Sequence, residues 1–444
     1  MSRSEQNQPR SRYYDVLLVN LDRELQPELT SERARFLYGA VRRILASLAV
    51  ANDSVPPVPE NLAALYPDAP CRAGRLEGSD LEGAVGLEGE LLDAIEEKIR
   101  QRLLPKEQAG GGAEGAAAVT PEAIESYLRR RVDPGAKVER FKILAGGRSK
   151  QNIMLTVVDG AGAKVERVIR RDLMVGITGS TVGEEFGVLT ALAARGCPVP
   201  RPLLCEGDTT VLGSAFMLME KVEGALAGDV FDPPPAREQV LASATELARL
   251  HQLPVNEVAE TLREDRRIAP SAERLRAEIA EHEDGWRAQS RAHSATMDAA
   301  FCWLCDNVEK LHPVTAIVHG DYSYHNILYS GGALSAVMDW ELVRVGHPAE
   351  DLGYIRTAAS KRVDWAEFIA FYYEAGGPRV SEREAIFFTL LGRLRLMAML
   401  FKARRYFEAG MTDDLQIADV SLYHISRIIH QMSVAMREAY ALPA

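Results

Sequence analysis

The amino-acid sequence predicts an α+β chain in which a small strand-rich segment precedes a long, mostly helical one. Three short segments with the composition of β-strands follow one another within residues 138–171, and hydrophobic spacing typical of helices covers most of the chain beyond residue 235. A polar loop between two short apolar runs interrupts those helices at residues 316–341. Strands followed by helices are typical of α+β folds, and polar loops on such a scaffold are common functional sites.

The first part of the chain is composed differently from the rest. Residues 1–104 carry two stretches of helical periodicity around a proline-rich interval, which predicts a helical accessory domain without a legible role. Residues 105–119 contain three consecutive glycines and a run of alanines, a composition typical of a flexible linker. We therefore expect the next folded domain to begin near residue 120.

A helix and three strands are predicted after the linker. Thr120-Pro121-Glu122 combines an N-cap residue, a proline suited to the first helical turn and an acidic side chain, so a helix is expected to run to Arg131. The strands are expected at Val138–Leu144, Asn152–Val158 and Val165–Arg171, and Asp159–Gly162 provides a hairpin connection between the last two.

The turn between the first two strands is a candidate phosphate-binding loop. Gly146, Gly147 and Ser149 lie in this turn, where backbone N–H groups can approach phosphate oxygens. By itself the pattern fits an ordinary tight turn at least as well. Arg170, near the end of the third strand, is a candidate for binding the α- and β-phosphates, because a guanidinium can bind phosphate in a bidentate manner.

A helix predicted at Thr181–Ala194 supplies an acidic partner for this cation. Glu184 and Glu185 both lie in its first turn, and either could hold Arg170 in place; Glu185 is favoured. Both could equally form a solvated acidic helix start. A further strand expected at Val211–Val222 would end at a hinge between two lobes, where backbone groups of Glu220 to Val222 would meet an adenine ring and Met217 or Met219 would line its slot.

The polar loop at 316–341 carries three groups spaced for phosphoryl transfer. His319 and Asp321 form a His-x-Asp pair, Asn326 follows Asp321 by five positions, and Asp339 ends the next apolar run. This order matches the catalytic loop and metal ligands of protein-kinase-like folds. A carboxylate such as Asp321 can accept the proton of an attacking hydroxyl, whereas an amide and a carboxylate oxygen suit Mg²⁺. The alternative is a set of ordinary turn residues.

Composition limits the classes of partner. A net charge of −11 argues against nucleic acid as the main partner, and no apolar run approaches the roughly 20 residues needed to span a bilayer. The N-terminal residues lack the apolar segment of a secretory signal, so a cytoplasmic location is expected. Five scattered cysteines favour reduced thiols over a disulfide framework.

Taken together, these motifs resemble the aminoglycoside phosphotransferase family of small-molecule kinases, over about residues 120–400. The matching motifs are Gly146-Gly147-x-Ser149, Val168-Ile-Arg170, Glu185, Phe216-Met-Leu-Met-Glu220, Leu250-His251, His319-Gly-Asp321 with Asn326, Met338-Asp-Trp-Glu341, Gly346-His-Pro348 and Asp351-Leu352. The resemblance implies a two-lobed kinase-like fold, with a nucleotide-binding lobe at 120–222 and a helical lobe at 223–444 that carries the catalytic loop and the acceptor site.

The resemblance also implies roles for individual residues. Asp321 would be the catalytic base, Asn326 and Asp339 the Mg²⁺ ligands, and Arg170 with Glu185 the pair that holds the phosphates of ATP. His319 and Asp351 would support the catalytic loop. The family usually has an asparagine directly after the serine of the phosphate loop, whereas this chain has Lys150.

Two further motifs resemble one branch of that family. Val168-Ile-Arg-Arg171 and Asp339-Trp-Glu341 look like the branch that is fused to, or encoded with, acyl-CoA dehydrogenases. This resemblance implies phosphorylation of a hydroxyl group on a small molecule such as a hydroxyacyl-CoA or hydroxy acid, with an acyl-CoA dehydrogenase as a metabolic partner.

Two other functions remain open at this stage. An aminoglycoside or other antibiotic phosphotransferase would need an acidic acceptor cleft, for which Glu281, Glu283, Asp284 and Glu374 are candidates. A non-catalytic binding protein on a kinase scaffold is disfavoured by the intact set of Asp321, Asn326 and Asp339. The sequence does not choose between ATP and GTP, and it does not indicate an oligomeric state.

Overall fold

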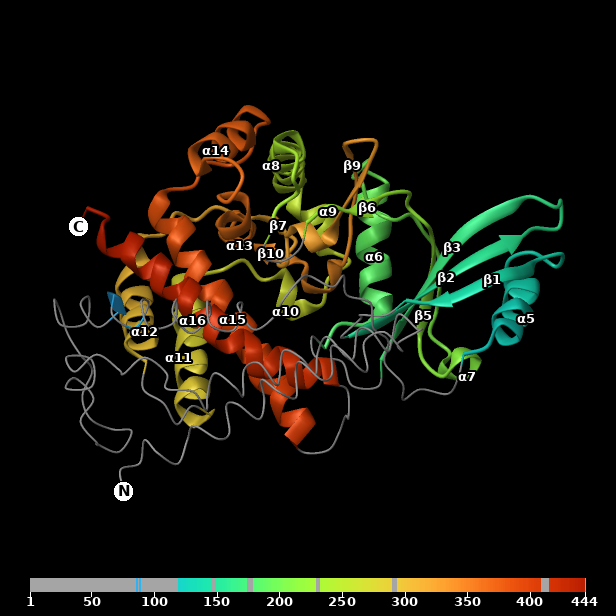
Figure 1. The fold of residues 1–444 in the computed structure, drawn as a ribbon, viewed down its shortest axis with the longest axis horizontal. Helices are drawn as coiled ribbons and strands as arrows, with labels where there is room; N and C mark the ends of the chain where they lie inside the picture. Colours follow the sequence, from blue (N-terminus) through green and yellow to red (C-terminus); the bar gives the residue numbers. More distant parts are fainter. Residues whose placement is uncertain are drawn as a thin grey trace, which may run out of the picture. The chain divides into compact units, whose positions relative to one another are not determined.

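A computed structural model of the chain describes residues 85, 86, 88, 119–144, 149–173, 179–228, 232–289, 294–408 and 415–443. The chain divides into two compact units: Met1–Gly111 with Ala272–Leu311 and Thr389–Ala444, and Gly112–Ser271 with His312–Phe388. The accessory domain and the linker predicted for residues 1–119 lie almost entirely outside the described residues. The α+β class is confirmed, because an antiparallel sheet is followed by a largely helical region (Figure 1).

A five-stranded antiparallel sheet forms the first part of the second unit, in the order β1-β2-β3-β5-β4. Its strands are β1 (Lys137–Ile143), β2 (Lys150–Val158), β3 (Lys164–Asp172), β4 (Pro202–Glu206) and β5 (Phe216–Glu220). The first three lie close to their predicted positions. The strand expected from Val211 is shorter than predicted, because Thr209–Leu212 forms the short helix α7, which Asp208 caps at Thr210 N–H and Gly213 ends with φ +78°.

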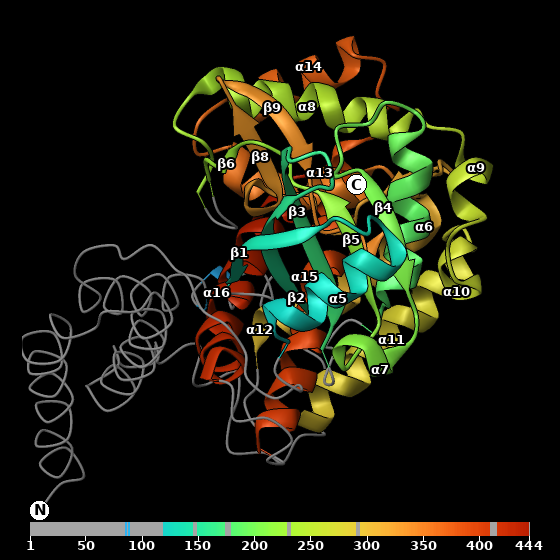
Figure 2. The same ribbon diagram turned by 90° about the vertical axis from the view of Figure 1, so that its right-hand side faces the viewer.

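One face of this sheet is apolar and packs against a helix. Ile153, Leu155, Ile169, Phe216 and Leu218 alternate along their strands and share a buried cluster with side chains of α5 (Pro121–Arg131). Figure 2 shows α5 lying against the strands. Thr120 caps α5 as predicted, since its hydroxyl accepts the Ala123 N–H at 3.2 Å. The opposite face carries Met217 and Met219, which pack in a cluster with α6 and α8, and also the buried side chain of Arg170.

Helix α6 (Val182–Ala193) follows the third strand and begins with a capping box. The Thr181 hydroxyl accepts the Glu184 N–H, and the Glu184 carboxylate accepts the Thr181 N–H. Glu184 is therefore used in capping the start of the helix, whereas the side chain of Glu185, the next residue, is buried. The predicted helix at 181–194 is confirmed.

The rest of the second unit combines helices with two small sheets. Its helices are α8 (Arg237–His251), α9 (Val255–Ala259), α10 (Glu264–Arg267), α13 (Ala349–Ala359) and α14 (Trp365–Glu374). Its strands are β6 (Ala225–Leu226), β7 (Ala316–Val318), β8 (Ile327–Ser330), β9 (Ala333–Val337) and β10 (Arg344–Gly346). They pair as β6-β8-β9 and β10-β7, so both predicted apolar runs of the polar loop lie in short strands.

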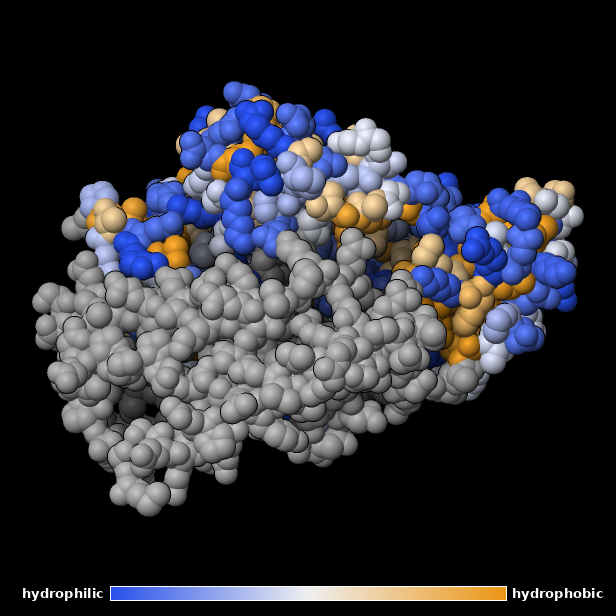
Figure 3. Space-filling model, viewed as in Figure 1, coloured by the Kyte–Doolittle hydropathy of each residue, from blue (hydrophilic) through white to orange (hydrophobic). Residues whose placement is uncertain are grey.

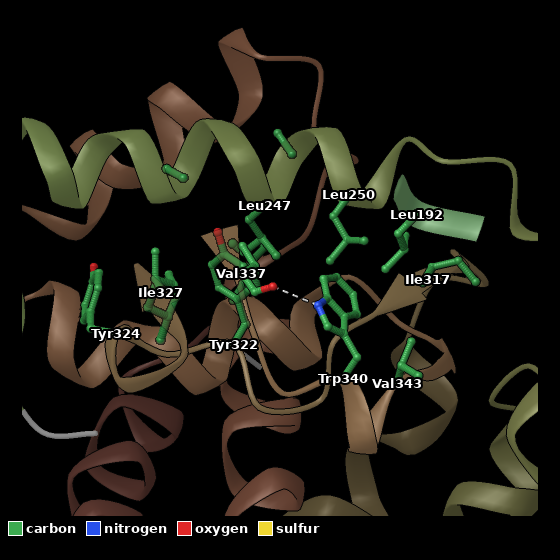
Figure 4. Close-up of a cluster of buried hydrophobic side chains, with 14 of the residues drawn as sticks. Leu192, Leu247, Leu250, Ile317, Tyr322, Tyr324, Ile327, Val337, Trp340 and Val343 are labelled. Carbon is green, nitrogen blue, oxygen red and sulfur yellow. Dashed lines mark hydrogen bonds between the residues drawn. The ribbon is translucent and has the colours of Figure 1, made fainter. Parts of the chain in front are cut away.

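A buried apolar cluster supports these strands (Figure 4). Leu247 and Leu250 of α8 point toward Tyr322, Val337 and Trp340. The Trp340 indole N–H donates to the Val337 carbonyl at 2.9 Å, so the polar edge of this large side chain is satisfied inside the core. The cluster fixes the ends of β7 and β9, from which the polar loop residues emerge.

The first unit contains α11 (Ala272–Gln289), α12 (Ala295–Asn307), η3 (Val308–Lys310), the later part of α15 (Glu382–Glu408) and α16 (Leu415–Tyr440). Arg395 of α15 forms an ion pair with Glu278 of α11.

In the described part of the chain, no helix is long and apolar enough to cross a membrane. Figure 3 shows mostly hydrophilic side chains over α14.

Candidate active site

The loop after β7 makes a sharp turn that depends on a glycine. Gly320 has φ +83°, and a Cβ atom there would approach the Leu342 carbonyl oxygen to 2.6 Å. The Asp351 carboxylate accepts the N–H groups of His319 (2.7 Å) and Gly320 (2.8 Å), while His319 Nε2 lies 2.9 Å from the Met338 carbonyl oxygen. His319 and Asp351 therefore lie where supports of the loop were expected.

A buried histidine completes this support. His251, at the end of α8, lies 3.2 Å from Asp351 Oδ2 through Nε2 and 2.7 Å from the Tyr372 hydroxyl through Nδ1. Both neighbours are fully buried. The Leu250-His251 motif thus brings a histidine to the carboxylate that holds the loop, and this residue does not reach Asp321 directly.

Asp321 and Asn326 lie together, at the two ends of the loop. Asn326 Nδ2 donates to Asp321 Oδ2 and to the Asp321 carbonyl, both at 3.0 Å. The amide nitrogen is thus used within the loop, and the amide oxygen is the atom left to bind a cation. The Asn326 carbonyl accepts the Met338 N–H at 2.8 Å, which brings Asn326 beside the segment that carries Asp339.

The protonation of Asp321 follows from its neighbours. Burial raises the pKa of this carboxyl, but the charge and hydrogen bond of His325, a hydrogen bond from Tyr354 and the charge of His319 together lower its pKa to about 2. His325 Nε2 lies 3.2 Å from Asp321 Oδ2. Asp321 is therefore ionised at neutral pH and can act only as a hydrogen-bond acceptor toward an incoming hydroxyl.

Arg170 links the sheet, helix α6 and the loop after β9. Its Nε donates to Glu185 Oε2 at 2.7 Å, and its Nη2 donates to Asp339 Oδ1 at 2.6 Å. Glu185 Oε1 also accepts the Trp340 N–H at 3.2 Å. Of the two glutamates considered, Glu185 is the one that contacts Arg170. Glu184 forms the capping box and lies 3.4 Å from Arg263.

Asp339 has a backbone conformation that is uncommon among residues other than glycine. It is the one non-glycine residue with positive φ in the described part of the chain, at φ +64°. Two positions later, burial and the charge of Asp339 raise the pKa of Glu341 to about 7, despite the opposing charges of Arg170 and Lys150. Carboxylates are thus concentrated beside Arg170.

The structure places the remaining predicted residues only in part. Gly146 and Gly147 lie outside the described residues, whereas Ser149 directly precedes β2 and is buried. Glu220 ends β5, and its N–H donates to the Arg201 carbonyl at 2.9 Å. At the expected hinge, the N–H of Val222 makes no backbone hydrogen bond to another described residue.

The structure describes both methionines that were considered for the adenine slot. Met217 and Met219 are buried within the apolar cluster that includes side chains of α6 and α8, and a slot lined by either of them stays a prediction. Sequence reasoning also gave no role to His325, Tyr354 or Lys150. The sequence held a signal for two of these residues: His325 directly precedes Asn326, and Lys150 departs from the family pattern.

The chain is similar to known proteins in sequence and in fold. The model of the phosphotransferase enzyme family (APH) matches residues 140–387, more than half of the chain. Among curated proteins, acyl-CoA dehydrogenase family member 11 of Rattus norvegicus is 29% identical over 180 residues, which cover 39% of this chain and 22% of that protein. The chain thus matches about a fifth of the length of that relative. Viomycin phosphotransferase of Streptomyces vinaceus is 30% identical over 190 residues, covering 38% of this chain and 59% of that enzyme.

Solved structures show the same fold at lower identity. A macrolide 2'-phosphotransferase of Brachybacterium faecium has a TM-score of 0.51 and 16% identity, covering 68% of this chain and 98% of that one. A spectinomycin phosphotransferase in complex with ADP and spectinomycin has a TM-score of 0.52 and 11% identity, covering 72% and 100%. The kinase-like fold is thereby confirmed, and the chain belongs to the phosphotransferase enzyme family.

Proposed function

We propose that this phosphotransferase moves the γ-phosphate of ATP, with Mg²⁺, to a hydroxyl of a hydroxyacyl-CoA or hydroxy acid. The observation that carries the reaction type is the arrangement of Asp321, Asn326, Arg170, Glu185 and Asp339 around one point at the ends of β7 and β9. A binding protein without activity would not require an ionised carboxylate held by its own loop.

Within this proposal Asp321 orients the acceptor hydroxyl and accepts its proton as the oxygen attacks the γ-phosphorus. Oδ2 of Asp321 already receives Asn326 Nδ2 and faces His325 Nε2, so the other carboxylate oxygen is the one directed to the acceptor. Arg170 would hold the α- and β-phosphates, and Glu185 would keep its guanidinium in place.

The donor set fits a magnesium ion. The amide oxygen of Asn326 and the carboxylate of Asp339 are hard oxygen ligands, and backbone contacts bring their segments together. These two residues would hold the ion, which neutralises negative charge on the phosphates when bound. Gly146, Gly147 and Ser149 would contact the phosphates through the phosphate loop, and Glu220 and Val222 would bind adenine through their backbone.

Sequence similarity favours an acyl acceptor. Two acyl-CoA dehydrogenase relatives are each 29% identical to this chain, over 180 and 179 residues, and an acyl-CoA dehydrogenase is the metabolic partner we propose. The alternative is an antibiotic acceptor, which the 30% identity with viomycin phosphotransferase supports. We further propose a cytoplasmic location, in keeping with an ATP-dependent reaction, and retain the division into lobes at residues 120–222 and 223–444.

An ADP-release screen tests this function. Purified protein would be incubated with Mg·ATP or Mg·GTP and with hydroxyacyl-CoAs, hydroxy acids, sugars, choline or aminoglycosides in turn. We expect ADP release with a hydroxyacyl-CoA or hydroxy acid, and a phosphate ester in the product by mass spectrometry. Release with aminoglycosides alone would overturn the acyl proposal in favour of the antibiotic alternative.

A further inference from the structure

Lys150 is a buried cation that the proposed reaction does not use. It is the first residue of β2, and its side chain is 3% exposed. Lysine is almost never buried to this extent without partners, since removal of an ammonium group from water is costly unless hydrogen bonds replace the lost solvation. The acceptors around Lys150 therefore indicate what the residue does.

Those acceptors lie on both sides of the segment that joins β3 to α6. Lys150 Nζ lies 2.6 Å from the Ser180 carbonyl oxygen, 3.4 Å from Ser180 Oγ and 3.1 Å from Asp172 Oδ1. Asp172 is the last residue of β3 and pairs with Lys150 across the β2–β3 ladder. Ser180 comes two residues before the first residue of α6. One ammonium group thus joins the end of a strand to the start of a helix.

The same carboxylate also binds the helix itself. Asp172 Oδ1 accepts the N–H of Val182, the first residue of α6, at 3.1 Å. This N–H is among the donors that have no partner within a helix. Lys150, Asp172 and the α6 start therefore form a closed set of contacts, and the Thr181 capping box adds to it. The first turn of α6 is held at this point by charge-assisted hydrogen bonds.

Glu185 lies on that first turn. It comes four residues after the N-cap Thr181, and its carboxylate holds Arg170 at 2.7 Å. Displacement of the α6 start by an ångström would lengthen this contact beyond hydrogen-bond range. Lys150 also lies 3.9 Å from Glu341, two residues beyond Asp339, so the ammonium faces the loop that carries the proposed metal ligand as well.

We propose that Lys150 is a positioning residue for nucleotide binding: its ammonium group fixes the first turn of α6 to the end of β3 and thereby keeps Glu185 against Arg170. The inference rests on the proposed function insofar as Arg170 binds phosphate. Its structural part, the fixed start of α6, does not depend on any activity.

The test compares Lys150→Met with Lys150→Arg and with the exposed control Lys164→Met. Lys164 lies on the same sheet and pairs with Glu139 at the surface. We expect Lys150→Met to raise the Kd for Mg·ADP and the KM for ATP by at least about tenfold, as for lost hydrogen bonds to a charged group. The kcat at saturating ATP should change much less, and Lys150→Arg should recover most of the affinity. Lys164→Met should leave both constants unchanged.

Hydrogen exchange provides the readout that needs no substrate. In Lys150→Met the amides of the first turn of α6 should exchange faster than in the wild type, while those of α5 should not. Unchanged exchange in α6 together with unchanged affinity for Mg·ADP would overturn the proposal. A lower kcat with unchanged KM would also overturn it, because it would place Lys150 in the chemical step.

Asp172→Asn is the second variant, in case Lys150→Met fails to fold. It keeps an oxygen for the Val182 N–H but removes the charge opposite Lys150, so faster exchange at the α6 start and weaker Mg·ADP binding are again expected. Wild-type exchange and affinity in Asp172→Asn would contradict the proposal. A wild-type protein that binds no nucleotide would refute the proposed function alone, since the exchange comparison would still decide the role of Lys150.

Discussion

Arg170 and Asp339 are bonded to each other, with Nη2 and Oδ1 separated by 2.6 Å. One is the proposed phosphate-binding cation and the other a proposed metal ligand, so Mg·ATP would replace this contact with one contact to phosphate and one to metal. The exchange keeps both charges compensated, because Glu185 retains its own bond to Arg170. Nucleotide and metal are therefore expected to bind together.

Arg170→Met is expected to weaken nucleotide binding and to destabilise the fold. The substitution leaves Glu185 buried without its cation, and the loss of one partner of a buried ion pair costs about 3–5 kcal/mol. Calorimetry with Mg·ADP and urea unfolding would measure the two effects. Arg167→Met, on the same strand and the opposite face of the sheet, is the matched control. Equal losses in both variants would argue against a specific role for Arg170.

Asp321→Asn is expected to abolish phosphoryl transfer while leaving nucleotide binding largely intact. An amide cannot accept the proton of the hydroxyl, and the loss of a general base lowers rates by roughly 10²–10⁴-fold. Turnover of the substrate found in the ADP-release screen, beside calorimetry with Mg·ADP, would measure both properties. Undiminished turnover in this variant would show that another group accepts the proton.

Asp339→Ala is expected to remove the part of nucleotide binding that depends on Mg²⁺. The variant loses a carboxylate ligand and frees Arg170 Nη2. ADP titrations with Mg²⁺ and with EDTA should give nearly the same Kd in the variant, whereas the wild type should bind more tightly with Mg²⁺. Glu139→Ala, which removes an exposed carboxylate of β1 that pairs with Lys164, serves as the control. An unchanged Mg²⁺ effect in Asp339→Ala would assign the ion to other ligands.

His325 is expected to orient Asp321 through the 3.2 Å contact between Nε2 and Oδ2. His325→Leu removes this donor and should lower kcat by about tenfold, in line with the loss of one hydrogen bond to a charged group, with little change in the KM for ATP. His325→Gln presents an amide N–H in a similar place and should recover most of the rate. If the glutamine variant is as slow as the leucine variant, a hydrogen bond at this position is not what matters.

Glu384 gives a prediction for stability against pH. Burial raises its pKa, but the nearby imidazole of His347, at 3.5 Å, and hydrogen bonds from the N–H groups of Ser381 and His312 outweigh burial and lower the pKa below its usual value. Because the folded state favours the ionised form, Glu384 stabilises the fold above about pH 4.5, and this contribution is lost as the pH falls.

The corresponding variant is Glu384→Gln. It should lower the free energy of unfolding by about 1–3 kcal/mol at neutral pH, the value expected for charge-assisted hydrogen bonds, and by less in acid. Urea unfolding at several pH values would measure the difference. A constant difference at every pH would mean that side-chain shape, rather than charge, accounts for the effect.

Local signals predicted much of the fold and the candidate site. The capping residue Thr120, the strand compositions and the spacing of Asp321, Asn326 and Asp339 all depend on neighbours in sequence, and the structure brings these three side chains to adjoining strand ends. The choice between Glu184 and Glu185 depended on which side of α6 faces Arg170, a residue 15 positions before Glu185. Composition does not encode this orientation.

Long-range contacts account for what the sequence did not reveal. The ties of Lys150 to Ser180 and of His251 to Asp351 join residues 30 and 100 positions apart. The strand expected from Val211 was too long, because Thr209–Leu212 forms a short helix that Asp208 caps and Gly213 ends. The apolar run in the sequence obscured these two capping residues. The burial of Met217 and Met219 likewise depends on α6 and α8, whose contacts with β5 cannot be read from the local sequence.

The backbone conformation at Asp339 favours glycine, whereas the contacts made by this position require a carboxylate. Glycine adopts a positive φ at little cost, whereas for a residue with a side chain this conformation raises the free energy of the folded state by about 1 kcal/mol or more. Glycine, however, would provide no oxygen for a cation and no partner for Arg170. The site thus retains a strained residue whose geometry is maintained by the contacts of its carboxylate, so that the shape of this turn and the charge it presents depend on one another.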